Sequence, residues 1–309
     1  MRQAFIIGPV FLDIITSPLA RFPAPGEEQY IESLDISPGG FAITALTLAR
    51  LGVASSLISV LGADQFGGML SEKISGGGVD ASFLITSRTA PTSVSIAFPQ
   101  AGDRSFLTRA MREEDFLHGI LDALHSVPRE RVSHMHLNIS MLRNPELSGF
   151  VKECRARGAT VSLDLGWEEA QRWSADDWGL AALADIFKPN ETEALRITGA
   201  ADIPAALKVM RAHCPRPVIT LGAKGSVGLD DDGKPVFAQP YRVEPKNAVG
   251  AGDAFTAGYL YAYLKGMPAA DCLRYGNAAG ALTAGSRLSA AEDMGVDRLL
   301  AVMNGEGAI

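Results

Sequence analysis

The stretch NAVGAGDAFTAG, Asn247–Gly258, places two glycines and an aspartate directly before a segment that is typical of a helix. Gly250 and Gly252 would let the backbone approach a phosphate closely, where the first-turn N–H groups and the helix dipole attract negative charge. Asp253 would then face the group that receives the phosphate. An ordinary helix start, with Asp253 accepting hydrogen bonds from the next turn, explains the six residues GAGDAF equally well.

Outward from this stretch, short apolar runs alternate with helix-length amphipathic segments. This alternation is typical of βαβ units, in which helices cover both faces of a mostly parallel sheet. We therefore predict an α/β fold. The predicted strands are 55–62, 132–140, 159–166, 185–190 and 217–225, and the predicted helices are 42–52, 145–158, 191–199, 205–214, 252–266 and 269–285.

The N-terminal part of the chain contains the first departures from this alternation. Residues 4–16 predict one buried first strand, in which Asp13 is either a turn carboxylate or a ligand-binding group. Residues 26–39 and 92–111 predict extra strands. Region 92–111 is predicted to form a hairpin of two strands with its turn at Gln100 to Asp103. We interpret them as a small separate sheet inserted into the domain, because no flexible linker surrounds them.

Composition limits the class of protein. A chain of 309 residues suits one large α/β domain or two small ones. The formal net charge of -7 argues against a nucleic-acid partner, and no apolar run reaches the roughly 18 residues that span a membrane. Three scattered cysteines, Cys154, Cys214 and Cys272, favour neither disulfides nor zinc and fit a reducing cytoplasm.

The segment PNETE offers a second candidate for phosphate chemistry. Asn190 and Glu193 are three residues apart, so they lie on one face of the helix that follows. The pair could hold the hydration shell of Mg²⁺, an ion that keeps waters and takes few protein oxygens. The alternative is a capping box, in which the two side chains only begin the helix.

Other motifs are rejected on their residues. GLDDDGK, Gly228–Lys234, has the spacing of a phosphate loop, but it contains three aspartates and is followed by proline, so we predict a hairpin turn. No GxGxxG follows the first strand, which argues against a dinucleotide-binding enzyme. The five histidines match no catalytic motif and are interpreted as core or surface residues.

Taken together, six segments resemble, in order and over almost the whole chain, the motifs of the ribokinase-like, PfkB-type carbohydrate kinase family. The segments are GGFAITALTLARLG (39–52), GADQFG (62–67), GDR (102–104), KPNETE (188–193), VITLGAKGS (218–226) and NAVGAGDAFTAG (247–258). The resemblance implies a ribokinase-like three-layer α/β/α sandwich with a mostly parallel sheet and a small β-sheet lid. It also implies a single kinase domain over residues 1–309, with lid strands approximately within 11–38 and 92–111.

The resemblance implies roles for the residues of the phosphate side. Asp253 would accept the proton of a substrate hydroxyl that attacks ATP, and the amides of Gly250, Ala251 and Gly252 would form the anion hole. Mg²⁺ would be held through water by Glu193 and Asn190. Nucleotide-binding positions carried over from the motifs are Asn190, Thr220, Gly222, Lys224, Gly225 and Asn277.

The acceptor side is assigned in the same way. Asp13, five residues after Gly8, matches an aspartate that binds substrate hydroxyls, and the lid would exclude water from the reaction. The substrate-binding positions implied are Asp13, Gly39, Gly40, Thr44, Arg104 and Arg109. The two arginines could instead be solvated residues of an edge strand. Relatives often pair their lid sheets, which makes a homodimer possible.

Two departures from the family pattern change what we expect. The helix after Gly39 and Gly40 offers Ile43 or Thr44 where relatives have an asparagine on the sugar, so ribose or fructose specificity does not carry over. Asn247 and Ala248 replace an Asp-Thr pair beside a monovalent cation, so K⁺ activation is expected to be weak or absent.

The sequence therefore predicts an ATP-dependent, cytoplasmic kinase. It is expected to phosphorylate a hydroxyl group, in the leading interpretation a primary one, of a sugar or sugar-like substrate. Two alternatives remain open, a nucleoside kinase of the same fold and a non-catalytic regulator that binds a sugar or nucleotide.

Overall fold

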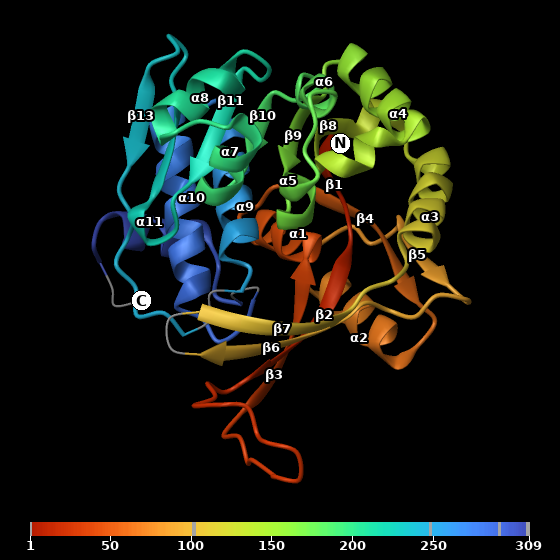
Figure 1. The fold of residues 1–309 in the computed structure, drawn as a ribbon. Coiled ribbons are helices and arrows are strands. Elements are labelled where there is room, and N and C mark those ends of the chain that lie inside the picture. Colours follow the sequence, from red (N-terminus) through yellow and green to blue (C-terminus); the bar gives the residue numbers. More distant parts are fainter. Residues whose placement is uncertain (1, 101–102, 247–248, 290–291, 307–309) are drawn as a thin grey trace.

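The computed structural model describes residues 2–100, 103–246, 249–289 and 292–306, without the side chains of Gln100, Asp103 and Arg104. A nine-stranded sheet in the order β13-β12-β11-β10-β9-β8-β1-β4-β5 forms the centre of the molecule. Seven of its strands, from β11 across to β5, are parallel, and β12 and β13 add an antiparallel edge. Figure 1 shows helices in front of and behind this sheet and a second sheet below it.

The elements have the following bounds. The strands of the large sheet are β1 (Gln3–Ile7), β4 (Ser55–Gly62), β5 (Leu84–Ser87), β8 (Val132–Asn138), β9 (Thr160–Asp164), β10 (Ile186–Lys188), β11 (Arg216–Thr220), β12 (Ser226–Leu229) and β13 (Pro235–Ala238). The helices are α1 (Phe41–Arg50), α2 (Gln65–Gly76), α3 (Glu113–Ser126), α4 (Pro145–Ala156), α5 (Trp167–Gln171), α6 (Asp177–Ala181), α7 (Glu191–Thr198), α8 (Ile203–Arg211), α9 (Ala251–Leu264), α10 (Ala269–Ala284) and α11 (Val296–Met303).

The core divides into two clusters because successive side chains of a strand point to opposite faces of the sheet. In β1, Ala4 and Ile6 join a cluster with α1, α2, α9, α10 and α11, whereas Phe5 and Ile7 join a cluster with α3, α4, α7 and α8. All four side chains are fully buried. The two clusters are the interfaces of a three-layer α/β/α sandwich, which confirms the predicted fold class.

The second sheet has the strand order β3-β2-β6-β7, formed by β3 (Leu34–Gly40), β2 (Val10–Thr16), β6 (Val94–Gln100) and β7 (Asp103–Arg109). It lies below the large sheet in Figure 1. Gln100 pairs with Asp103 across the predicted hairpin, and the two residues of the turn lie outside the described chain. The four strands fall in the two regions where a lid was expected.

The first strand differs from the prediction. Residues 4–16 form two strands, β1 and β2, which belong to different sheets. Pro9 stands between them, and a proline has no N–H with which to continue the hydrogen-bond ladder of the sheet. Because residues 4–16 are apolar except for Asp13 and the final Thr16, their pattern does not show that the chain passes from the large sheet to the small sheet near Pro9.

Other expectations for the backbone agree with the structure in part. The predicted strand 132–140 ends at Asn138, the predicted strand 217–225 ends at Thr220 and is followed by a 3₁₀ turn at Gly222–Lys224, and within the predicted region 26–39 the strand begins only at Leu34. Residues 230–234 connect β12 to β13 as the predicted hairpin turn, with the Asp230 N–H donating to the carbonyl of Lys234. His134 and His136 are core residues, buried beside Ser162 in β9. Over the described residues, we find no helix whose length and apolar character would allow it to cross a membrane.

Candidate active site

Side chains of the candidate site stand in a row at the carboxyl ends of neighbouring strands. Asn138 at the end of β8 pairs with Asp164 at the end of β9, which pairs with Lys188 at the end of β10. One step further, Asn190 forms a bridge with Thr220 of β11. Ligands of open α/β sheets bind at this edge, because loops and helix N-termini converge there.

Helix α9 begins at this edge, and its two glycines have different reasons to be there. Gly250 is the N-cap residue with φ of 79°, a left-handed conformation that favours glycine. A Cβ at Gly250 would lie 2.5 Å from Ile43 Cδ1 and 2.5 Å from the Ser289 carbonyl oxygen. Apart from its chain neighbours and the adjacent backbone of its own helix, no atom of the described residues lies within 4 Å of a Cβ at Gly252. The backbone is therefore bare and accessible at Gly252, as an anion hole requires.

Asp253 lies in the first turn of α9 and is only partly exposed. Burial raises its pKa to about 7, and the nearby carboxylates of Asp164 and Asp13 act in the same direction, while Lys188 opposes them. A carboxyl group with a pKa near neutrality can accept a proton in one step and release it in the next. This is the electrostatic environment of a general base.

Lys188 is the cation of the site. The residue is 8% exposed, and its Nζ lies 3.0 Å from Asp164 Oδ1. Burial opposes the charge, but attraction to Asp164, Asp253 and Glu193 outweighs it and raises the pKa of the lysine. A permanently charged ammonium group therefore stands among the carboxylates of this edge.

Asn190 and Glu193 form a complete capping box at the start of α7. Asn190 Oδ1 accepts from the Glu193 N–H at 2.9 Å, and Glu193 Oε2 accepts from the Asn190 N–H at 2.8 Å. Burial raises the pKa of Glu193 to about 7. The capping box that was predicted as the alternative to a Mg²⁺ site is thus present. It uses Glu193 Oε2 and leaves Glu193 Oε1 outside the box. No cluster of three His, Cys, Asp or Glu side chains suited to a metal exists in the described chain.

The predicted nucleotide positions fall into two groups. Thr220 is the last residue of β11 and pairs with Asn190 in the same row, and Gly222 and Gly225 follow in the turn after the strand. Lys224 is exposed and binds Glu191 of α7, with Nζ 2.6 Å from Oε2. Its charge is therefore already balanced.

Asn277 of α10 lies in a different setting. The side chain is 8% exposed, and its Nδ2 donates to the carbonyls of Ala238 and Gln239, both at 3.0 Å. These bonds attach α10 to the chain at the end of β13. The side-chain amide of Asn277 therefore stabilises the fold.

On the acceptor side, Asp13 is buried in β2 and its Oδ2 accepts from Ser289 Oγ at 3.0 Å. Burial raises the pKa of Asp13 to about 7, against the lowering effect of that hydrogen bond. Gly39 in β3 gives the carboxylate its space, because a Cβ there would overlap the Asp13 carboxyl group. Gly40 is the N-cap of α1, which follows directly.

Two of the other predicted acceptor residues donate hydrogen bonds to backbone carbonyls of the protein itself. Thr44 is fully buried, and its Oγ1 donates to the Asp253 carbonyl at 3.2 Å, which connects α1 to the start of α9. Arg109 at the end of β7 donates from Nη2 to the Thr92 carbonyl at 2.9 Å. Arg104 belongs to β7, and its side chain lies outside the described residues.

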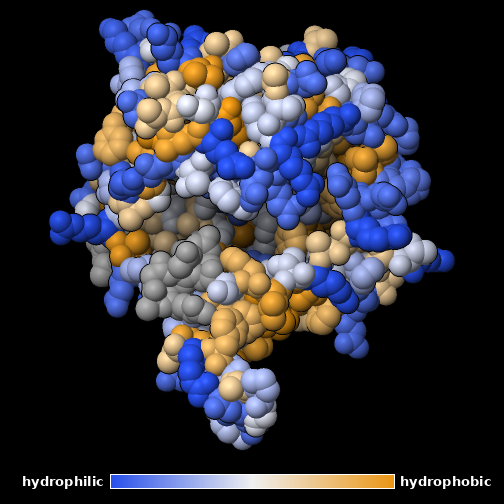
Figure 2. All heavy atoms as spheres, viewed as in Figure 1, coloured by the Kyte–Doolittle hydropathy of each residue, from blue (hydrophilic) through white to orange (hydrophobic). Residues whose placement is uncertain are grey.

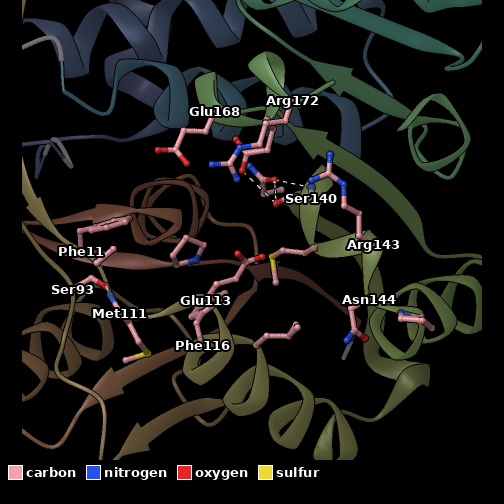
Figure 3. A pocket seen from close by; sticks show the side chains of 17 residues that line it. Phe11, Ser93, Met111, Glu113, Phe116, Ser140, Arg143, Asn144, Glu168 and Arg172 are labelled. Atoms are coloured by element: carbon pink, nitrogen blue, oxygen red, sulfur yellow. Dashed lines mark hydrogen bonds between the residues drawn. The ribbon is translucent and has the colours of Figure 1, made fainter. Parts of the chain in front are cut away.

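A cavity of about 630 Å³ opens beside this row, between the second sheet, α3 and α5 (Figure 3). Asn138, a member of the row, lies in the wall of the cavity. Phe11, also in the wall, pairs with Gly39 of the acceptor side. Its size is typical of a small-molecule site.

Sequence reasoning missed three residues of this site, Lys188, Asp164 and Ser289. A signal existed for the first two, because each is a charged residue two positions before the end of a predicted strand, close to the edge where ligands gather. Ser289 gave no signal, since it follows α10 in an irregular segment and reaches Asp13 only through the fold.

Comparison of the sequence with known proteins identifies its family. The family model described as pfkB family carbohydrate kinase matches residues 1–293. The chain is 28% identical over 292 residues to a ribokinase of Haemophilus influenzae, covering 92% of each chain. It is 27% identical over 284 residues to a nucleoside kinase of Methanothermobacter thermautotrophicus, covering 90% of this chain and 87% of the relative.

A solved structure from Escherichia coli, assigned as a ribokinase II in complex with ATP and Mg²⁺, shares the fold. It superposes with a TM-score of 0.81 at 21% sequence identity and covers 99% of this chain and 100% of its own.

Proposed function

Because the chain belongs to the pfkB family of carbohydrate kinases, we propose that it transfers the γ-phosphoryl group of ATP to a primary hydroxyl of a sugar or sugar-containing acceptor. As a member of that family, it is a sugar or nucleoside kinase. The observation that carries the finer proposal is Asp253, a carboxyl group with a pKa near 7 at the N-terminus of α9, next to an open glycine amide.

In this mechanism, Asp253 accepts the proton of the acceptor hydroxyl as its oxygen forms a bond to the γ-phosphorus and the bond to ADP breaks. The amides of Gly250, Ala251 and Gly252 stabilise the negative charge of the transferring group, where positioning and electrostatics supply most of the catalysis. The Lys188 ammonium adds a buried positive charge at the same edge.

ATP and Mg²⁺ are the proposed cosubstrate and metal, supported by the related structure that contains both. Glu193 and Asn190 would hold Mg²⁺ through its waters, with Glu193 Oε1 as the oxygen that the capping box does not use. The metal would neutralise phosphate charge. Thr220, Gly222, Gly225 and Lys224 would face the nucleotide, and K⁺ activation is expected to be weak or absent.

On the acceptor side, Asp13, Gly39 and Gly40 would meet the acceptor hydroxyls, with Thr44 behind them and Arg104 and Arg109 on the second sheet. That sheet would act as a lid that excludes water from the transfer. We place the enzyme in the cytoplasm as a single domain, and we propose that two copies pair through their lids.

The decisive experiment compares the wild type with Asp253→Asn in a coupled ADP-release assay over sugars, sugar acids and nucleosides, with and without K⁺. We expect the variant to bind ATP with unchanged affinity in calorimetry and to lose at least about 10²-fold in kcat, the usual contribution of a general base. Retained turnover would contradict the role of Asp253. Ligand binding by the wild type, without product from any acceptor, would favour a non-catalytic regulator.

A further inference from the structure

The cavity beside the active site indicates what the acceptor carries. We propose that the acceptor is a nucleoside, whose uncharged planar base occupies the 630 Å³ cavity while its sugar hydroxyl reaches Asp253. This inference rests on the proposed kinase function and narrows its substrate class.

The position of the cavity suits such an acceptor. Its wall reaches the carboxyl end of β8 at Asn138, one strand away from Asp164. On the other side it includes Phe11 of β2, two residues before Asp13 in the same strand. A group bound in the cavity thus lies next to the strand that carries Asp13 and one strand away from Asp164.

The wall offers apolar and aromatic surface where a polyhydroxyl compound needs hydrogen bonds. Figure 3 shows Phe11, Met111 and Phe116 along one side of the cavity. Sugar hydroxyls against these side chains would lose hydrogen bonds to water without replacement. A planar base has a face that packs well against aromatic rings and methionine.

The polar groups of the wall also fit a base. Asn138 and Asn144 both use their side-chain oxygens within the protein, accepting from the N–H groups of Ser140 and Leu147. Both residues line the cavity, and the hydrogen bonds of the described residues leave their NH₂ groups available. Such donors can meet the ring nitrogens and carbonyl oxygens of a base.

The charges of the wall disfavour an anionic acceptor such as a sugar acid or a sugar phosphate. Glu113, Glu168 and Glu169 line the cavity together with Arg143 and Arg172. Arg143 is already paired with a carboxylate outside the lining, since its Nε and Nη2 lie 3.1 and 2.9 Å from Asp177 Oδ1. With Arg143 paired, the remaining charged side chains of the wall give the cavity a negative electrostatic potential, which repels an anionic acceptor.

The first test measures kcat/KM with ATP and Mg²⁺ for adenosine, guanosine, cytidine, uridine, ribose, fructose and gluconate. We expect at least one nucleoside to exceed every free sugar by about tenfold or more, the scale of one base stacked on an aromatic side chain. A free sugar or gluconate with the highest kcat/KM would overturn the inference and leave the kinase function standing. No phosphorylation of any acceptor contradicts the kinase function itself.

Two variants test the cavity. Phe116→Ala should raise the KM for the best nucleoside about tenfold and leave the KM for ATP unchanged, whereas the matched control Leu300→Ala on α11 should change neither. Glu113→Lys should lower the discrimination against gluconate by about tenfold, and Glu114→Lys, the exposed neighbour outside the cavity, should not. The inference is wrong if Glu113→Lys and Glu114→Lys give the same ratio of nucleoside to gluconate activity.

Discussion

At the scale of single residues, the two glycines of the GAG turn predict opposite outcomes for one substitution. Gly252→Ala should fold as well as the wild type, because the new methyl group meets no described atom beyond the adjacent backbone of its own helix. It should nevertheless lower kcat at least tenfold by obstructing the phosphate. Gly250→Ala should cost about 1–3 kcal/mol of stability through its left-handed backbone and its contact with Ser289. Thermal unfolding and ADP release measure the two effects, and a Gly252→Ala enzyme with normal kcat would contradict the anion hole.

Three carboxyl groups with raised pKa values predict how stability and activity depend on pH. Asp13, Glu193 and Asp253 each have a pKa raised to about 7, so each binds its proton more tightly in the folded than in the unfolded chain. Their contribution to the free energy of unfolding is complete below pH 4 and is lost as the pH rises through about 7. Activity needs the ionised Asp253 and should rise over the same interval.

Asp253→Asn separates these effects, because the amide remains neutral at every pH. The variant should have a higher Tm than the wild type at pH 8, and this difference should disappear near pH 4. Asp232→Asn on the exposed β12–β13 turn is the matched control and should show no such trend. A wild type whose kcat/KM stays constant from pH 5 to pH 8 would contradict a base with a pKa near 7.

At the scale of elements, the end of β10 places Lys188 between carboxylates that belong to three other elements. Lys188→Met should destabilise the fold by about 3–5 kcal/mol, since Asp164 would lose its buried ion-pair partner. The pH at which activity reaches half its maximum should also rise, because the pKa of Asp253 would lose a lowering influence. Lys224→Met removes an exposed ion pair and should change Tm little.

At the scale of the whole molecule, the second sheet carries an exposed apolar surface. Leu34 of β3 and Leu107 of β7 are 55% and 64% exposed, Tyr30 in the segment before β3 is 86% exposed, and orange atoms lie over part of the sheet in the lower half of Figure 2. A surface of this kind is typical of an association site. We expect a dimer in sedimentation analysis that Leu107→Lys converts to monomer, whereas Leu300→Lys should leave it intact. A monomeric wild type would contradict pairing through the lids.

What the sequence could predict follows from the range of the forces involved. The alternation of strands and helices, the glycine turn at Gly250 and the capping pair at Asn190 depend on residues near each other in the chain, so local patterns predict them. The division of residues 4–16 between two sheets was not predicted, because strand apolarity does not identify the sheet to which a strand belongs.

By itself, the sequence determined the α/β class, the family motifs and the position of Asp253 at a helix start. Only the tertiary structure decided that Asp164, Lys188 and Ser289 join that aspartate and Asp13, since these contacts link segments far apart in the chain. It also decided the apolar wall and negative charge of the cavity. Burial and the distances between charges set the pKa of a carboxyl group, and both exist only once the chain has folded.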